Sequence, residues 1–247
     1  MDLKSLEEKI ISNFKTENIN GILLAGSYAT NTQTENSDID LRLIFNNDRK
    51  HTVKGIKYIE GLKVSYFGEN IGMVKKRMSV DFSRNSRFEA RLFTLGKILY
   101  DQDGNVEELV QYAKIFMENS FQKKLTQDDI TLRMYSLHVR HESLLNTPLS
   151  NPIYTYNYIS FMKAVLVTYS VILNYEMVID IKPEKILTNS SYREINQWKD
   201  FPDQDFVELW IKGVYEITPN NLEAVYQYVQ SQTLVIERKD FEVIYRD

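Results

Sequence analysis

Two aspartates, Asp38 and Asp40, open an apolar segment that continues to Phe45. The segment predicts a β-strand over residues 38–45, in which residues i and i+2 project from the same face. The two carboxylates would then point the same way, and their like charges would repel each other unless a cation lay between them. Hard divalent ions such as Mg²⁺ take oxygen ligands of this kind and are often shared with substrate phosphates. The pair therefore predicts a metal site for phosphate chemistry.

Gly26 and Ser27 follow an apolar run, residues 21–25, that predicts a buried strand, and ten residues separate them from Asp38. A glycine lets the backbone approach a ligand closely, and free N–H groups at the start of a following helix attract phosphate. The two elements together predict a site for a nucleoside triphosphate and a divalent metal, suited to nucleotidyl transfer. The alternative is a polar loop between two core strands, with the aspartates at a solvated strand edge.

The pattern Gly26-Ser27, ten residues, Asp38-x-Asp40 resembles the polymerase-β-like nucleotidyltransferases, in which it marks the catalytic core. Within that superfamily, the layout is most similar to kanamycin-type aminoglycoside nucleotidyltransferases and to paired nucleotidyltransferase and HEPN proteins. The segment 92–101 is similar to the end of their N-terminal domain. The resemblance implies dependence on Mg²⁺ or Mn²⁺, an NTP substrate with ATP as the expected nucleotide, and transfer of the nucleoside monophosphate to a hydroxyl.

The resemblance also assigns roles to individual residues. Gly26 and Ser27 would hold the β- and γ-phosphates, and Asp38 and Asp40 would bind the metal. The Thr30 hydroxyl could also reach phosphate. Arg42, two positions after Asp40, should point to the same side of the strand, where it would contact phosphate or brace the aspartates.

A third carboxylate from a neighbouring strand usually completes the metal site in the superfamily. The corresponding segment here is Leu62-Lys-Val-Ser-Tyr-Phe67, and the position that would point toward the aspartates is Ser65. Glu60 and Glu69 could take this role only in a different register. In a two-metal mechanism, loss of one ligand weakens the ion that activates the nucleophile. Ser65 is therefore the expected third position of the metal site and the main argument against full activity.

A hydroxyl nucleophile would be helped by a general base. The related antibiotic enzymes use a glutamate on the first long helix of the second domain, and Glu142, His138 and His141 are the candidates on the helix predicted here. Glu142 is the predicted base, although the family glutamate aligns nearer to residues 135–136. The alternative is that Glu142 is a solvated residue on the surface of the helix with no catalytic role. Arg133 and His138 also form the Arg-x₄-His spacing of HEPN ribonucleases, with Met134 where those enzymes place a polar residue.

The composition is that of an ordinary soluble protein, with 247 residues, 43% hydrophobic and 26% charged residues. No cysteine is present, which excludes disulfides and zinc–thiolate sites. Residues 1–20 lack a signal-like apolar run, so we expect a cytoplasmic protein with no membrane association. Residues 121–247 carry 13 basic and 17 acidic side chains, which accounts for the whole net charge of −4. This excess of acidic side chains does not favour nucleic-acid binding. It would suit a cationic partner, and the alternative is that these side chains form an ordinary solvated surface.

The elements that must position these residues change character along the chain. Strands are predicted at 21–25, 38–45, 51–59, 62–67 and 96–100, with Glu60-Gly61 as a hairpin turn. Helices are predicted at 3–14, 71–78, 87–94 and 105–119. Beyond Thr126, whose motif indicates a capped helix start, long helical patterns dominate: 130–145, 154–177, a turn at Pro183, 205–214 and 221–232. The tail 233–245 has no clear assignment.

The predicted fold class is therefore α+β. A nucleotidyltransferase domain with a small mixed sheet would span 1–122, and an all-α, HEPN-like bundle that binds substrate would span 123–247. The predicted function is Mg²⁺-dependent nucleotidyl transfer from an NTP to a hydroxyl of a small molecule such as an aminoglycoside-like antibiotic, or of a protein or RNA. The acceptor would lie between the domains, and the resemblance implies a homodimer. The alternative is a catalytically impaired protein of the same fold that binds a nucleotide or a partner, in a toxin–antitoxin or regulatory role.

Overall fold

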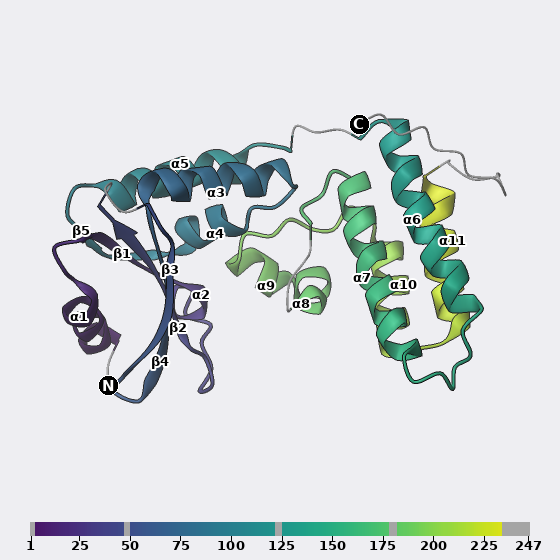
Figure 1. Ribbon diagram of the computed structural model, residues 1–247, viewed down its shortest axis with the longest axis horizontal. Coiled ribbons are helices and arrows are strands. Elements are labelled where there is room, and N and C mark those ends of the chain that lie inside the picture. The colour runs from purple at the N-terminus through teal and green to yellow at the C-terminus, as the bar shows by residue number, and fades with distance from the viewer. Residues whose placement is uncertain (1–2, 47–49, 122–124, 178–181, 234–247) are drawn as a thin grey trace. The chain divides into compact units, whose positions relative to one another are not determined.

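The computed structural model describes residues 3–46, 50–121, 125–177 and 182–233 of the chain. The chain forms two compact units, of which unit 1 comprises residues 1–120 with 195–197, and unit 2 comprises 121–194 with 198–247. Unit 1 holds a five-stranded sheet with helices, and the described part of unit 2 is helical (Figure 1). The predicted α+β class is confirmed.

The sheet of unit 1 has the order β3-β4-β2-β1-β5. Its strands are β1 (Ile19–Ala25), β2 (Ile39–Phe45), β3 (Val53–Ile59), β4 (Leu62–Asn70) and β5 (Lys97–Asp101). β2 and β4 are parallel, and the other three pairs are antiparallel, so the sheet is mixed. The five predicted strands are confirmed. Glu60 and Gly61 both have positive φ, 51° and 80°, as the predicted two-residue hairpin turn between β3 and β4 requires.

The two faces of the sheet are covered by different helices (Figure 1). One face packs its β1 and β2 side chains against α1 (Leu3–Phe14). The opposite face packs Leu23 and Ile44 against α3 (Ile71–Ser83), α4 (Phe88–Leu95) and α5 (Asn105–Glu118). Alternation along β2 therefore sends Leu41 and Leu43 to the α1 side and Asp40 and Arg42 to the side of α3–α5.

Unit 2 buries one apolar core among its long helices. Its described helices are α6 (Gln127–Leu145), α7 (Tyr154–Ile172), α8 (Pro183–Thr188), α9 (Ser190–Ile195), α10 (Gln204–Tyr215) and α11 (Pro219–Gln232). The predicted start of α6 is confirmed, because the Thr126 side chain accepts from the backbone N–H of Asp129 in a capping box. None of the helices described by the structure is long and apolar enough to cross a membrane.

Two predictions about unit 2 were wrong or incomplete. The helix predicted over 154–177 ends at Ile172, because Asn174 adopts a left-handed conformation (φ 52°) and the Tyr175 N–H bonds to the Ser170 carbonyl at 2.8 Å. The six-residue helix α9 was not predicted. The unassigned tail lies outside the described residues from position 234 onward.

Candidate active site

Asp40 lies on β2, and Gly26 lies directly against its carboxylate. Gly26 opens the four-residue helix α2 (Gly26–Ala29) at the end of β1, with a φ of +65°. A Cβ added to Gly26 would lie 2.3 Å from Oδ2 of Asp40, well inside van der Waals contact. Both the backbone conformation and the lack of space therefore favour glycine at this turn. The structure brings together the Gly-Ser turn and the aspartate, which are separated by more than ten residues in sequence.

Ser27 and Thr30 belong to the same short turn. Ser27 is the second residue of α2, and its carbonyl accepts from the Thr32 N–H at 2.9 Å. The Thr30 hydroxyl is 3.4 Å from both the Gly26 and the Ser27 carbonyls and 2.9 Å from the Thr32 hydroxyl. Thr30 therefore braces the turn internally, while Ser27 stands next to the glycine that contacts Asp40.

Asp38 precedes β2, and its carboxylate is held by two residues of β4. The Ser65 hydroxyl donates to Oδ2 of Asp38 at 2.9 Å, and Nζ of Lys63 lies 3.2 Å from the same oxygen. The hydrogen bond from Ser65 is the main reason that the pKa of Asp38 lies below its usual value of 3.8, and Lys63 adds to the effect. Asp38 is therefore held in its ionised form.

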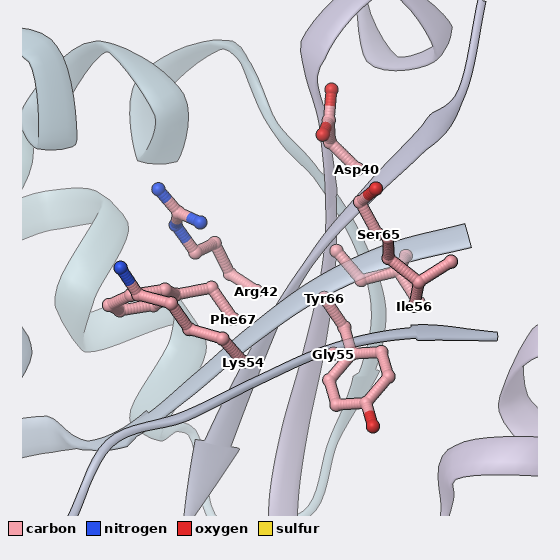
Figure 2. Close-up of a pocket in the computed structure, with 9 residues that line it drawn as sticks. Asp40, Arg42, Lys54, Gly55, Ile56, Ser65, Tyr66 and Phe67 are labelled. Atoms are coloured by element: carbon pink, nitrogen blue, oxygen red, sulfur yellow. The ribbon is translucent and has the colours of Figure 1, made fainter. Parts of the chain in front are cut away.

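Ser65 occupies the position on the neighbouring strand that faces the aspartates. In the parallel pairing of β2 and β4, Asp40 is the register partner of Ser65. Figure 2 shows the Ser65 hydroxyl and the Asp40 carboxylate on the same side of the sheet. The two glutamates considered as substitutes bind elsewhere: Glu60 accepts from Lys9 at 2.7 Å, and buried Glu69 pairs with Arg77.

The exposed part of this sheet face lines an open cavity of about 500 Å³ (Figure 2). Its lining residues follow the register of three strands, with one row of Asp40, Ser65 and Ile56 and a second row of Arg42, Phe67 and Lys54. The cavity therefore has the Asp40 carboxylate at one side, apolar surface from Ile56 and Phe67, and cationic groups in the second row.

Arg42 is paired with a buried glutamate from α4. Its Nε and Nη2 donate to the two carboxylate oxygens of Glu89, at 3.0 and 3.1 Å, and only 1% of the Glu89 side chain is exposed. Burial raises the pKa of Glu89, and the charge of Arg42 opposes that rise. Glu89 therefore balances the Arg42 charge, and a phosphate contact would use the remaining Nη1 of Arg42.

Phe67 is contacted by three cations. The guanidinium carbons of Arg42 and Arg77 lie 4.7 and 4.8 Å from the ring centroid, and Nζ of Lys54 lies 5.0 Å from it. Cation–π contacts of this kind orient positive charge over an aromatic face. Phe67 therefore gathers positive charge in the row next to Asp40 and Ser65.

The predicted base, Glu142, lies on α6 in unit 2. Its side chain is 63% exposed, and its Oε1 is 3.7 Å from Nε2 of His138. Nδ1 of His138 is 2.9 Å from the Tyr226 hydroxyl, whereas buried His141 pairs with Glu223 at 2.7 Å. Glu142 is thus an accessible carboxylate, while the two histidines are engaged in packing contacts of the helical unit.

The oxygen donors near the Gly-Ser turn fit a hard divalent cation. Asp38 and Asp40 supply carboxylates, and Ser65 supplies a hydroxyl on the same side. Across the described part of the chain, no group of three or more His, Cys, Asp or Glu side chains could hold a metal ion. Two carboxylates match the way in which Mg²⁺ is bound, by one or two protein carboxylates together with water and substrate phosphates.

Residues 8–105 match the family model described as polymerase beta, nucleotidyltransferase. The N-terminal unit contains a nucleotidyltransferase domain of the polymerase beta type. This match covers the Gly-Ser turn, the aspartate pair and the strand with Ser65. The kanamycin-type resemblance stays a prediction.

Two further comparisons add little to this assignment. Among solved structures, the chain is similar to a nucleotidyltransferase-like protein from Exiguobacterium sibiricum 255-15. The identity is 13% over 93% of this chain and 78% of that chain, with a TM-score of 0.42. No curated protein matches the chain.

Sequence reasoning missed Lys63 and the carboxylate partner of Arg42. Lys63 lies two residues before Ser65 on β4, so strand alternation alone would have placed it on the same face. The pairing of Arg42 with Glu89 joins residues 47 positions apart, and no local pattern signals it.

Proposed function

We propose that the protein is a Mg²⁺-dependent nucleotidyltransferase that moves a nucleoside monophosphate from an NTP to a hydroxyl acceptor. The observation that carries the proposal is the contact between Gly26 and the Asp40 carboxylate, within a domain that matches the polymerase beta nucleotidyltransferases. This contact brings the backbone of the Gly-Ser turn next to the carboxylate that would hold the metal. A triphosphate bound along the turn would therefore meet the metal ligands directly.

The reaction forms one bond to phosphorus and breaks another. The acceptor oxygen attacks the α-phosphorus, the bond from that phosphorus to the bridging oxygen breaks, and pyrophosphate leaves with the bond electrons. The acceptor proton passes to a base, for which we propose Glu142. A bound Mg²⁺ would neutralise charge on the phosphate oxygens and align the reacting groups.

The protein residues have separate roles in this proposal. Asp38 and Asp40 hold the metal, and Ser65 keeps Asp38 ionised and oriented through its 2.9 Å hydrogen bond. The backbone at Gly26 and Ser27 contacts the β- and γ-phosphates, and Thr30 supports the turn. The acceptor occupies the cavity of about 500 Å³ beside Asp40.

The test is pyrophosphate release with each of the four NTPs against a panel of hydroxyl acceptors. The panel includes aminoglycoside-like antibiotics, protein hydroxyls and RNA ends. We expect release with at least one pair, and loss of that release in Asp40→Asn, which keeps the side-chain shape and removes the charge. Turnover retained in Asp40→Asn would refute the assignment.

A second candidate is a protein that binds the nucleotide without transferring it, and Ser65 in place of a third carboxylate is the observation that favours it. Binding of an Mg²⁺–NTP with no pyrophosphate release across the whole panel would support this candidate. A regulatory or toxin–antitoxin role would then be the interpretation to pursue.

A further inference from the structure

Lys63 lies close enough to the proposed metal site at Asp38 and Asp40 for its charge to affect what binds there. Its register partner in the antiparallel pair of β3 and β4 is Tyr58, and it shares a sheet face with Ser65, two residues further along β4. Nζ of Lys63 is 3.2 Å from Oδ2 of Asp38, the oxygen that also accepts from Ser65 at 2.9 Å. The lysine ammonium, the serine hydroxyl and the aspartate therefore converge on one point beside Asp40.

We propose that the Lys63 ammonium supplies the positive charge that a second metal ion provides in two-metal phosphoryl chemistry, so that this site works with one divalent cation. The inference rests on the proposed function and names a further residue for it. In this arrangement Lys63 interacts with the phosphate or the acceptor oxygen, while Asp38 and Asp40 hold the single metal.

The charge balance supports this assignment. A site with three carboxylates and two divalent cations carries a single net positive charge. A site with two carboxylates, one lysine and one divalent cation carries the same net charge. Replacement of the third carboxylate by Ser65 removes a ligand that a second cation needs, and Lys63 on the same strand restores the lost positive charge. Cationic side chains of this kind stabilise transferring phosphoryl groups in place of, or beside, metal ions.

The placement also predicts competition between Lys63 and the metal for Asp38. Two positive charges that approach one carboxylate oxygen repel each other, and Coulomb's law gives about a tenfold effect on divalent-ion affinity at a separation of roughly 5 Å in water. A surface lysine that makes no contact with Asp38 would have no such effect. Binding of the metal alone and binding of the nucleotide should therefore respond in opposite directions when Lys63 is removed.

The experiment is equilibrium dialysis of the full chain with Mn²⁺, alone and with non-hydrolysable analogues of the four NTPs, which counts the ions and nucleotides bound per chain. We expect one Mn²⁺ per bound analogue in the wild type. In Lys63→Met, Mn²⁺ alone should bind about tenfold more tightly. The analogue, at saturating Mg²⁺, should bind about tenfold more weakly through loss of a charge-assisted contact. The double variant Lys63→Met/Ser65→Asp should bind two Mn²⁺ per analogue.

Two control variants isolate the effect. Lys57→Met removes a lysine from β3 whose register partner is Val64, on the opposite face of the sheet, and both affinities should match the wild type. Lys63→Met/Ser65→Asn places a side chain of the aspartate shape at position 65 without its charge, and it should bind one Mn²⁺ per analogue.

The outcomes separate this inference from the proposed function. Two Mn²⁺ per bound analogue in the wild type, or affinities in Lys63→Met equal to those of Lys57→Met, would overturn the role of Lys63 and leave nucleotide binding intact. If no analogue binds to the wild type, the proposed function fails. The inference then fails with it, even if the Mn²⁺-only arm shows competition with Lys63.

Discussion

Substitution of Gly26 by alanine tests how the Gly-Ser turn and the aspartate depend on each other. At the φ of +65° observed for Gly26, alanine should lower the unfolding free energy of the protein by about 1–2 kcal/mol, because a left-handed backbone brings Cβ close to the carbonyl oxygen. The new Cβ would also lie 2.3 Å from Oδ2 of Asp40, whereas ordinary contact begins at 3.4 Å. The carboxylate must therefore move by about 1 Å, the difference between those two distances.

Gly104→Ala is the matched control for the cost of placing alanine in a left-handed backbone conformation. Gly104 also has a positive φ, 72°, but an added Cβ would meet nothing within 4 Å. Urea unfolding should therefore show a loss of about 1–2 kcal/mol for both variants. Calorimetry should then show that only Gly26→Ala binds Mn²⁺ and nucleotide more weakly, by about 10- to 100-fold, the usual effect of displacing a metal-ligating carboxylate through its neighbour.

If Gly26→Ala loses stability to the same extent as Gly104→Ala but binds Mn²⁺ and nucleotide like the wild type, the contact with Asp40 has no part in the site. Glycine would then be needed at position 26 only for the turn.

Three further predictions concern charged groups. Arg42→Ala leaves buried Glu89 without its guanidinium partner and should lower the unfolding free energy at pH 8 by about 3–5 kcal/mol. Because burial already raises the pKa of Glu89, urea unfolding at pH 5 should show a smaller loss. An equal loss at both pH values would contradict this role of Arg42. Ser65→Ala should raise the pKa of Asp38 toward 3.8, measured by carboxyl ¹³C NMR, and an unchanged pKa would show that the hydrogen bond has no effect. Burial is the main reason that the pKa of His141 is lowered, so its neutral form stabilises the fold above about pH 6.5 and this contribution is lost as the pH falls below that value. The wild type should therefore lose more unfolding free energy than His141→Gln between pH 7.5 and pH 5.5. Equal losses in the two proteins would contradict this role of His141.

Local patterns in the sequence predict the strands of the unit 1 sheet, but not the order in which they pair. Alternation around Asp38 and Asp40, apolar runs at β1 and β4, and the turn at Glu60-Gly61 predict strands that the structure contains. The strands and the turn depend on residues within a few positions of one another, so a single sequence carries them. Alternation along β4 also places Ser65 on one face of its strand, but its pairing with Asp40 across the parallel strands is a long-range contact that alternation does not set.

Other features depend on tertiary packing. The partner of Arg42 is Glu89, on a helix packed over the sheet, and this pairing depends on the burial of the Glu89 carboxylate. The side-chain hydrogen bond from Asn174 to the Phe121 carbonyl, 3.1 Å, likewise joins residues 53 positions apart, although the left-handed Asn174 that ends α7 is itself a local helix-stop signal. Neither contact has a signal in the residues next to it.

The most direct test of the central claim is a calorimetric titration of Mg²⁺–NTP into the wild type and into Asp40→Asn. We expect Mg²⁺-dependent binding of at least one NTP to the wild type, with that binding strongly weakened in Asp40→Asn while urea unfolding shows an intact fold. Equal binding to both proteins, or binding that does not change when Mg²⁺ is removed, would contradict the assignment of Gly26, Ser27, Asp38 and Asp40 to a metal–nucleotide site.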